Sequence, residues 1–394
     1  MPTVLAFVHF FLVIASYYII KPVRDALFVK TIGPDHMPLF YLVVALVVFL
    51  VVALYNRLIQ HFDSRRFTVG LQALVVVNIL SFWALMAAGL RPSASFYIWA
   101  SVYNVLLVTI FWSLTNDLFD THRGRKYYGV VGGGGIVGGI VGGVASRYLP
   151  LWVGTTHCLL FAAALMVLAV GVTVARVRGA PAGAAGRSGQ GGTSTLDDIR
   201  LVLADRHVRL IAQIVFFVTL AKTVFNYHYF HLVDAAIAGT DQAASFFGTV
   251  STATNVSSAV LQFVVTTWVL RRFGARVGLV ALPAVLLVAL TVLIFPVALS
   301  LAAGLSVAQQ SASYSINQSS KELLYTPCDQ AVKYRAKAVI DMFVFRFGDA
   351  FAALVLLALH SYLGLPPWTS LAVGLGCTAY WLQLVLRSPD PTRE

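Results

Sequence analysis

The sequence has few charged residues and few cysteines. Charged residues make up 11% of the 394 residues and hydrophobic residues 59%. The three cysteines, Cys158, Cys328 and Cys377, are widely scattered. Such spacing excludes a disulfide framework and the paired ligands of a zinc site. The shortage of charge excludes an ordinary soluble domain, because a soluble domain could not bury this much apolar surface.

Long apolar runs recur along the chain and are separated by short polar breaks. Crossing the hydrocarbon core as a helix takes roughly 18 or more mostly apolar residues, and we find twelve such runs. They lie at 3–20, 39–56, 69–90, 95–116, 129–147, 151–175, 208–232, 243–270, 277–295, 297–320, 337–360 and 367–387. A barrel would show short alternating segments instead, so we predict an all-α membrane protein with about twelve transmembrane helices.

Acidic residues are scarce, with 16 Asp and Glu against 28 Lys and Arg, and most of the basic residues fall in alternate loops. They are Arg57, Arg65 and Arg66 after the second run, Arg123, Arg125 and Lys126 after the fourth, Arg176, Arg178, Arg187, Arg200, Arg206 and Arg209 around the centre, Arg271, Arg272 and Arg276 after the eighth, Lys333, Arg335 and Lys337 after the tenth, and Arg387 and Arg393 in the tail. The positive-inside rule then places both termini in the cytoplasm. We predict a multi-pass protein of the cell inner membrane whose net charge of +12 reflects this topology and not nucleic-acid binding.

The chain divides near its middle, where residues 178–195 are rich in Gly, Ser and Ala and predict a flexible linker. Residues 62–65 are echoed by 273–276, about half a chain later, as a duplication would require. Two six-helix halves joined by a cytoplasmic loop resemble the major facilitator superfamily. The predicted parts are an N-terminal half at 1–177, a linker at 178–206 containing a short amphipathic helix, and a C-terminal half at 207–394.

Several cations are predicted to lie within the membrane. Lys21 and Arg24 follow the first run on the outer side, against the positive-inside rule. One interpretation is that helix one continues past Pro22 and presents both to an anionic substrate in a cavity. The other is that both side chains snorkel to headgroups. Lys222 lies about 20 Å along its helix from Arg209, which favours a cavity position.

Polar side chains also follow one face of two helices, Thr252, Asn255 and Gln262 on the eighth and Gln310, Ser313, Asn317 and Ser320 on the tenth. These stripes indicate either a hydrated path or hydrogen bonds between helices. Because cations outnumber acids among the charges expected at membrane depth, we predict an anionic substrate. The predicted substrate-binding residues are Lys21, Arg24, Lys222, Asn255, Gln262, Asn317 and Lys321.

Charges near helices ten and eleven are interpreted as salt bridges that gate or brace the bundle, or as direct substrate contacts. Arg346 and Asp349, for example, are one turn apart on the eleventh run. The predicted gating or coupling residues are Asp25, Asp117, Glu322, Asp341, Arg346 and Asp349.

Two further patterns are given simpler interpretations. Residues 133–138 fit a dinucleotide-binding glycine pattern, but no strand precedes them. The glycines recur every four residues, and this spacing indicates close packing between helices. His228, His231 and Asp234 are spaced by three, and we interpret them as an exposed helix end and not as a metal site. No cofactor and no metal are predicted.

Short stretches in both halves resemble the bacterial and plastid ATP/ADP translocase family. They are 20–27, 251–255, 321–327, 333–337, 340–341 and 346–349. The resemblance implies a facilitator-type fold, counter-exchange of nucleotides without ATP hydrolysis, and phosphate handling by Lys21, Arg24, Asp25, Lys321 and Glu322.

Three alternatives stay open from the residues alone. The first is proton-coupled transport of another solute with Asp25 or Asp349 as the proton carrier. The second is a membrane-embedded enzyme acting on lipid-linked phosphate, which we do not favour because the sequence offers no convincing nucleophile or metal cluster. The third is a sensor that does not transport. We expect a monomer whose partners are the bilayer and a small anion such as ATP or ADP.

Overall fold

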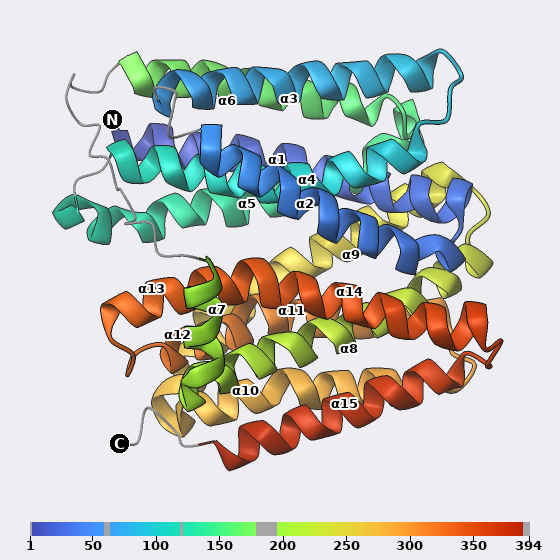
Figure 1. The fold of residues 1–394 in the computed structure, drawn as a ribbon. Helices are drawn as coiled ribbons and strands as arrows, with labels where there is room; N and C mark the ends of the chain where they lie inside the picture. The colour runs from blue at the N-terminus through green and yellow to red at the C-terminus, as the bar shows by residue number, and fades with distance from the viewer. Residues whose placement is uncertain (1, 59–63, 119–120, 179–194, 389–394) are drawn as a thin grey trace. The chain divides into compact units, whose positions relative to one another are not determined.

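The computed structural model describes residues 2–58, 64–118, 121–178 and 195–388, and these ranges contain helices and no strand. Each of the twelve predicted runs is helical (Figure 1). The α-helices are α1 (Pro2–Leu27), α2 (Met37–Leu58), α3 (Ser64–Ala87), α4 (Ser93–Leu118), α5 (Thr121–Val153), α6 (Cys158–Arg178), α7 (Thr195–Ala204), α8 (Arg206–Ala236), α9 (Thr240–Val260), α10 (Thr267–Val292), α11 (Leu299–Ala312), α12 (Gln318–Leu324), α13 (Gln330–Val339), α14 (Phe345–Leu356) and α15 (Trp368–Arg387). The predicted amphipathic helix of the linker is confirmed as α7, and most of the linker lies outside the described residues.

Five π-helical turns interrupt or end these helices. They are η1 (Phe28–Ile32), η3 (Leu261–Thr266), η4 (Ser313–Asn317), η5 (Ile340–Val344) and η6 (Leu357–Tyr362), and a 3₁₀ turn, η2 (Pro34–His36), precedes α2. The tenth and eleventh predicted runs are therefore built from short helical pieces. For this reason only nine stretches of the described chain are continuous and apolar enough to cross a membrane.

One of those nine stretches, at 240–292, contains two predicted spans. The helix direction breaks within it at Gly274, whose φ of 83° and ψ of 176° are not helical. A positive φ of this kind is readily adopted only by glycine. The break falls in the predicted loop between the eighth and ninth spans, as expected.

The helices pack into two compact units. Unit 1 consists of residues 1–33, 46–188 and 237–255, and its core lies between α1, α3, α4 and α6. Unit 2 consists of residues 34–45, 189–236 and 256–394, and in it α8 packs against α14 and α15. The start of α2 belongs to unit 2, and most of α9 belongs to unit 1. The domain boundaries predicted from the sequence stay a prediction.

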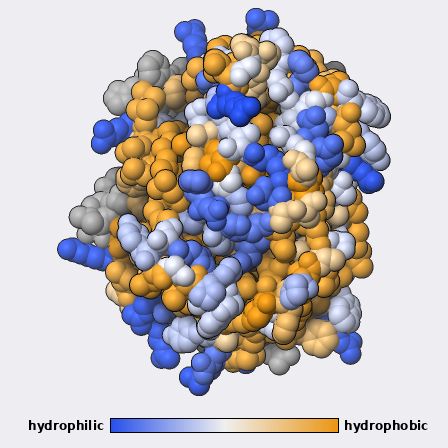
Figure 2. All heavy atoms as spheres, turned by 90° about the vertical axis from the view of Figure 1, so that its right-hand side faces the viewer, coloured by the Kyte–Doolittle hydropathy of each residue, from blue (hydrophilic) through white to orange (hydrophobic). Residues whose placement is uncertain are grey.

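Large apolar side chains remain exposed along the helices. On α2, Leu46, Leu50 and Leu54 recur every four residues and are 60%, 55% and 55% exposed. Figure 2 shows hydrophobic residues over wide areas of the face that it presents. In water this surface would favour aggregation, but in lipid it costs little, so it agrees with a multi-pass membrane protein.

The glycines of α5 allow α1 to pack closely against it. A Cβ at Gly138 would lie 2.5 Å from the Phe11 carbonyl oxygen and 3.2 Å from the Ala15 nitrogen, and Gly134 and Gly142 meet the α1 backbone in the same way. The predicted role of the glycine repeat in helix packing is confirmed. Since the obstacle is backbone, no side-chain rotation can make room for a methyl group.

We expect Gly138→Ala to lower the stability of the folded protein by about 1–3 kcal/mol, because the methyl group must push α1 away from α5. The measurement is thermal unfolding of the purified variant in detergent. Gly132→Ala on the same helix is the matched control, because a Cβ there meets nothing within 4 Å. Equal unfolding midpoints for the two variants would contradict this packing.

Candidate functional site

The predicted continuation of helix one past Pro22 is confirmed, since α1 runs to Leu27 and η1 extends it to Ile32. This continuation carries Arg24 and Asp25 into the interior of unit 1. Arg24 donates to Asp25 Oδ1 from Nε at 2.8 Å and from Nη2 at 2.6 Å. The two side chains are only 14% and 8% exposed. A buried ion pair of this kind needs further polar contacts to offset its desolvation.

Helix α4 supplies those further contacts to Arg24. Nη1 of Arg24 donates to Ser101 Oγ at 3.3 Å, and the guanidinium carbon lies 5.0 Å from the centroid of the Tyr97 ring. Lys21, three residues earlier on α1, holds its Nζ 5.8 Å from the centroid of the Tyr18 ring and is half-buried. Both predicted cations of unit 1 thus lie against tyrosine rings, a favourable contact for a cation.

Lys222 has a comparable environment in unit 2. Its Nζ donates to Ser313 Oγ at 3.2 Å and lies 5.5 Å from the centroid of the Tyr314 ring. Ser313 and Tyr314 begin η4, so the contact falls where the tenth span widens from α to π geometry. The polar face predicted for the tenth helix included Ser313, but no feature of the sequence indicated Tyr314.

Asp349 connects two helices beside Lys222. Thr223 Oγ1 on α8 donates to Asp349 Oδ1 at 2.9 Å, and Arg346 Nη1 lies 3.6 Å from Asp349 Oδ2. The α-carbon of Gly348 faces α8 closely, because a Cβ there would lie 3.0 Å from Thr219 Cβ. The predicted pairing of Arg346 with Asp349 is present, and the same carboxylate also ties α14 to α8.

Two ion pairs connect the end of the tenth span to the eleventh. Lys321 Nζ lies 3.2 Å from Asp341 Oδ1, and Lys337 Nζ lies 2.8 Å from both oxygens of Glu322. The buried Tyr325 ring lies in the loop after α12, where burial, with the nearby Asp341 and Glu322 carboxylates, raises the pKa of its hydroxyl. These pairs fit the bracing interpretation, while a substrate contact for Lys321 remains a prediction.

Reversing one charge of the Glu322–Lys337 pair should destabilise the protein, and reversing both should restore most of the loss. We expect Glu322→Lys or Lys337→Glu alone to cost about 0.5–1 kcal/mol, since both partners are more than a third exposed. Thermal unfolding of the two single variants and the double variant measures the coupling. A double variant no more stable than the singles would show that the pair does not brace α12 against α13.

The remaining predicted site residues lie at several separate places. Asn255 donates to the Gly139 carbonyl at 3.2 Å within unit 1, and Gln262 exchanges hydrogen bonds with Ser319 at 3.3 Å within unit 2. Both contacts join neighbouring helices, as one interpretation of the polar stripes expected. Asn317 is buried in η4, and its Oδ1 has no hydrogen-bond partner among the described residues. The side chain of Asp117 lies outside the described residues.

A buried polar network in unit 1 was not predicted, because Arg176 was counted among the cytoplasmic loop residues. Arg176 is 6% exposed and donates to His9 Nδ1 at 2.8 Å and to Thr115 Oγ1 at 3.1 Å. On the other side of the ring, His9 Nε2 lies 2.9 Å from Gln72 Nε2 and 3.0 Å from Thr173 Oγ1. Among the described residues Arg176 has no acidic partner.

The interpretation of His228, His231 and Asp234 as an exposed helix end is wrong for His228. Its side chain is buried, and its Nε2 lies 2.8 Å from Ser370 Oγ, which also lies 3.0 Å from His360 Nε2. His228 is buried because η6 and α15, which come more than a hundred residues later in the chain, cover this end of α8. The described residues contain no group that could hold a metal ion.

Comparison with known proteins gives a family match and a set of distant relatives. The model of a family described as TLC ATP/ADP transporter matches residues 155–365, which is more than half of the chain. A plastidic ATP/ADP-transporter of Solanum tuberosum is 22% identical over 323 residues, 73% of this chain and 50% of that protein. ADP,ATP carrier protein 1 of Chlamydia pneumoniae is 24% identical over 308 residues, 66% of this chain and 59% of that protein. The chain therefore spans between half and two thirds of the length of these two relatives.

Two solved structures show the same fold at low sequence identity. A variant of the nucleoside transporter NupG superposes with a TM-score of 0.71 at 14% identity and covers 98% of this chain and 99% of its own. An auto-inhibited POT family peptide transporter superposes with a TM-score of 0.69 at 10% identity, covering 98% and 97%. The predicted major facilitator-like, all-α membrane fold is confirmed.

Proposed function

Because this chain belongs to the TLC ATP/ADP transporter family, we propose that it is a secondary transporter that exchanges nucleotides of the ATP and ADP type across the inner membrane. Counter-exchange needs no hydrolysis, only alternating exposure of a binding site to the two sides. In this proposal both termini are cytoplasmic, as the distribution of Lys and Arg indicates, and the protein acts as a monomer.

One observation carries the proposal. Three cations that the sequence places at membrane depth each lie within 6 Å of a tyrosine ring, Lys21 over Tyr18, Arg24 over Tyr97 and Lys222 over Tyr314. A nucleotide offers anionic phosphates and a flat aromatic base. Ammonium and guanidinium groups bind phosphate through charge-assisted hydrogen bonds, and tyrosine rings can stack on the base.

The contacts of Lys222 can be exchanged for contacts to a ligand. Its ammonium group donates to a serine hydroxyl, and a phosphate oxygen is a stronger acceptor than a neutral hydroxyl. Arg24 is held differently, because Asp25 already neutralises it at 2.6 Å. We therefore assign direct phosphate binding to Lys21 and Lys222, and to Arg24 the role of a cation whose availability depends on Asp25.

We expect Lys21→Gln and Lys222→Gln each to reduce nucleotide exchange at least tenfold, since loss of one charge-assisted contact costs about 1.5–3 kcal/mol. The measurement is uptake of labelled ATP into proteoliposomes preloaded with ADP. Thermal unfolding of each purified variant checks that the folded protein is retained.

Arg147→Gln is the matched control for these variants. Arg147 lies 5.3 Å from the Tyr148 ring centroid, so it makes the same kind of contact, but both side chains are exposed at the outer end of α5. Exchange by this variant should equal that of the unmodified protein. If Lys21→Gln and Lys222→Gln both exchange nucleotide at the unmodified rate, the assigned site is wrong.

A second candidate function is proton-coupled transport of another solute, and Asp349 favours it. Its carboxylate is 15% exposed on a helix in the membrane region, where Thr223 and Arg346 hold it, as a proton-carrying group would be held.

We expect an imposed pH gradient to leave uptake into vesicles without counter-substrate unchanged, because counter-exchange depends on ADP inside and not on protons. Vesicles of the unmodified protein and of Asp349→Asn are compared with and without the gradient. Uptake that the gradient accelerates in the unmodified protein, and that Asp349→Asn abolishes, would favour proton coupling over exchange.

A further inference from the structure

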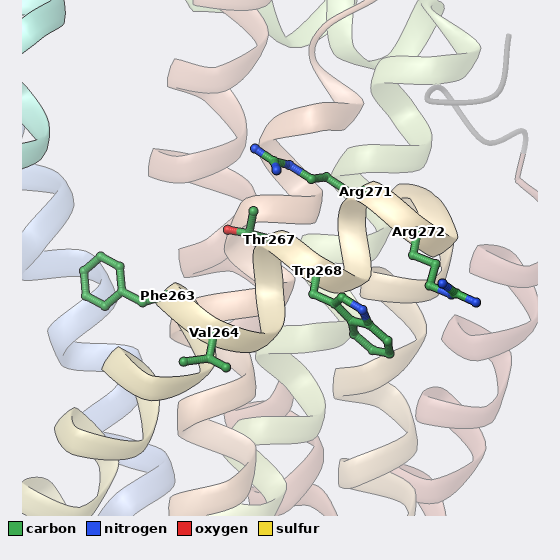
Figure 3. Close-up of a pocket in the computed structure, with 6 residues that line it drawn as sticks. All are labelled: Phe263, Val264, Thr267, Trp268, Arg271 and Arg272. Carbon is green, nitrogen blue, oxygen red and sulfur yellow. The ribbon is translucent and has the colours of Figure 1, made fainter.

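An open groove lies where the eighth span ends, on the segment that joins η3 to α10. Figure 3 labels its lining residues, Phe263, Val264, Thr267, Trp268, Arg271 and Arg272. The volume of this open groove is about 400 Å³. All six belong to one helical segment of ten residues, and Figure 3 shows Arg271 and Arg272 extending to different sides of it. Neither arginine takes part in an ion pair among the described residues.

The lining residues change in character along the helix. Phe263 and Val264 stand at one end of the groove, and Arg271 and Arg272 stand at the other, two residues before the break at Gly274. Arg271 comes eight residues after Phe263, which corresponds to roughly 12 Å at 1.5 Å per residue. That length reaches from the headgroup layer of a bilayer into its hydrocarbon core.

The apolar part of the groove is open. Phe263, Val264 and Trp268 are 69%, 66% and 56% exposed, within a stretch long and apolar enough to span a membrane. The Trp268 ring packs edge-on against Phe273 with centroids 5.4 Å apart, and the Arg272 guanidinium lies 5.9 Å from that same ring. Phe273 thus positions an aromatic and a cationic group side by side at the edge of the membrane.

We propose that this groove binds an anionic phospholipid of the cytoplasmic leaflet, of the phosphatidylglycerol class. Arg271 and Arg272 leave the helix on different sides (Figure 3) and reach the phosphate from two directions, for which their long side chains and planar guanidinium groups are suited. Trp268 lies at the level of the glycerol, where tryptophan is common in membrane proteins, and Phe263 with Val264 lines the acyl chains. The proposal concerns a surface of unit 2 distinct from Lys222 and does not rest on nucleotide exchange.

A soluble anion would use only half of this groove. Phosphate or a nucleotide can occupy the arginine end, but it gains nothing from apolar side chains about 12 Å deeper. A neutral lipid would use the other half and leave both guanidinium groups without an anion. Only a ligand that joins a phosphate of net negative charge to long apolar chains matches the whole groove, because the choline ammonium of a zwitterionic lipid already neutralises its phosphate.

The test is thermal unfolding of the purified full chain in neutral detergent with added lipid. Dioleoyl phosphatidylglycerol should raise the unfolding midpoint by about 2–5 °C, because a ligand that binds the folded state stabilises it. Dioleoyl phosphatidylcholine, with the same chains and no net charge, should produce at most a small part of that shift. The shift should disappear in Arg271→Gln/Arg272→Gln and fall by at least half in Trp268→Ala.

Two control variants separate this groove from general surface effects. Arg206→Gln/Arg209→Gln removes another exposed arginine pair from the predicted cytoplasmic side, and Trp152→Ala removes a tryptophan that is 77% exposed at the far end of α5. Both should keep the full phosphatidylglycerol shift. A full shift in Arg271→Gln/Arg272→Gln would overturn the proposal, as would equal shifts with the two lipids.

Soluble anions distinguish a lipid site from a free-phosphate site. Glycerol 3-phosphate and ATP, added at the same concentration as the lipid, should produce no shift that depends on Arg271 and Arg272. A shift equal to that of phosphatidylglycerol, lost in the double variant, would assign the arginines to a soluble anion and overturn the lipid proposal. This experiment measures lipid binding and not transport. Its result can therefore be interpreted even if the protein does not exchange nucleotides.

Discussion

A charged side chain within the hydrocarbon layer must find its partners inside the protein, and this constraint orders the polar groups of both units. Arg24 meets Asp25 and Ser101, and Asp349 meets Thr223 and Arg346. Each of these charges joins its own helix to a neighbour. Polar contacts that are costly to leave unsatisfied in lipid thereby fix which helices lie together, where apolar packing alone would discriminate poorly.

The groups assigned to function differ from those that brace the helices in what they contact. Lys222 meets a hydroxyl and an aromatic ring, whereas Lys337 meets a carboxylate at 2.8 Å from both its oxygens. A carboxylate satisfies an ammonium group fully, so that side chain serves as a brace. A phosphate oxygen is a stronger acceptor than a neutral hydroxyl, so the contact of Lys222 with Ser313 can be exchanged for a contact to an anion. In unit 1, Lys21 lies over the Tyr18 ring, and Arg24 is paired with its neighbour Asp25.

Much of this architecture was predictable from sequence, because hydrophobic length and the distribution of Lys and Arg are direct consequences of the bilayer. The twelve runs, the extension past Pro22 and the glycine packing of α5 are of this kind. The burial of His228 was not predictable, since it depends on segments more than a hundred residues away in the chain. The burial of Arg176 was not predictable either, because the sequence does not distinguish an arginine in a loop from an arginine in a buried network. Whether Asn255 or Gln262 touches substrate stays a prediction.

The π-helical turns add a property that a straight helix lacks. Gln262, Asn317 and Asp341 all lie in such turns, where one more residue is accommodated than α geometry allows. If the bulge moves one position along the chain, the residue that it passes turns by roughly 100° about the helix axis, while the helical segments on both sides keep their places. At these π-helical turns a polar side chain can therefore turn from one neighbour to another while the helix stays folded in lipid.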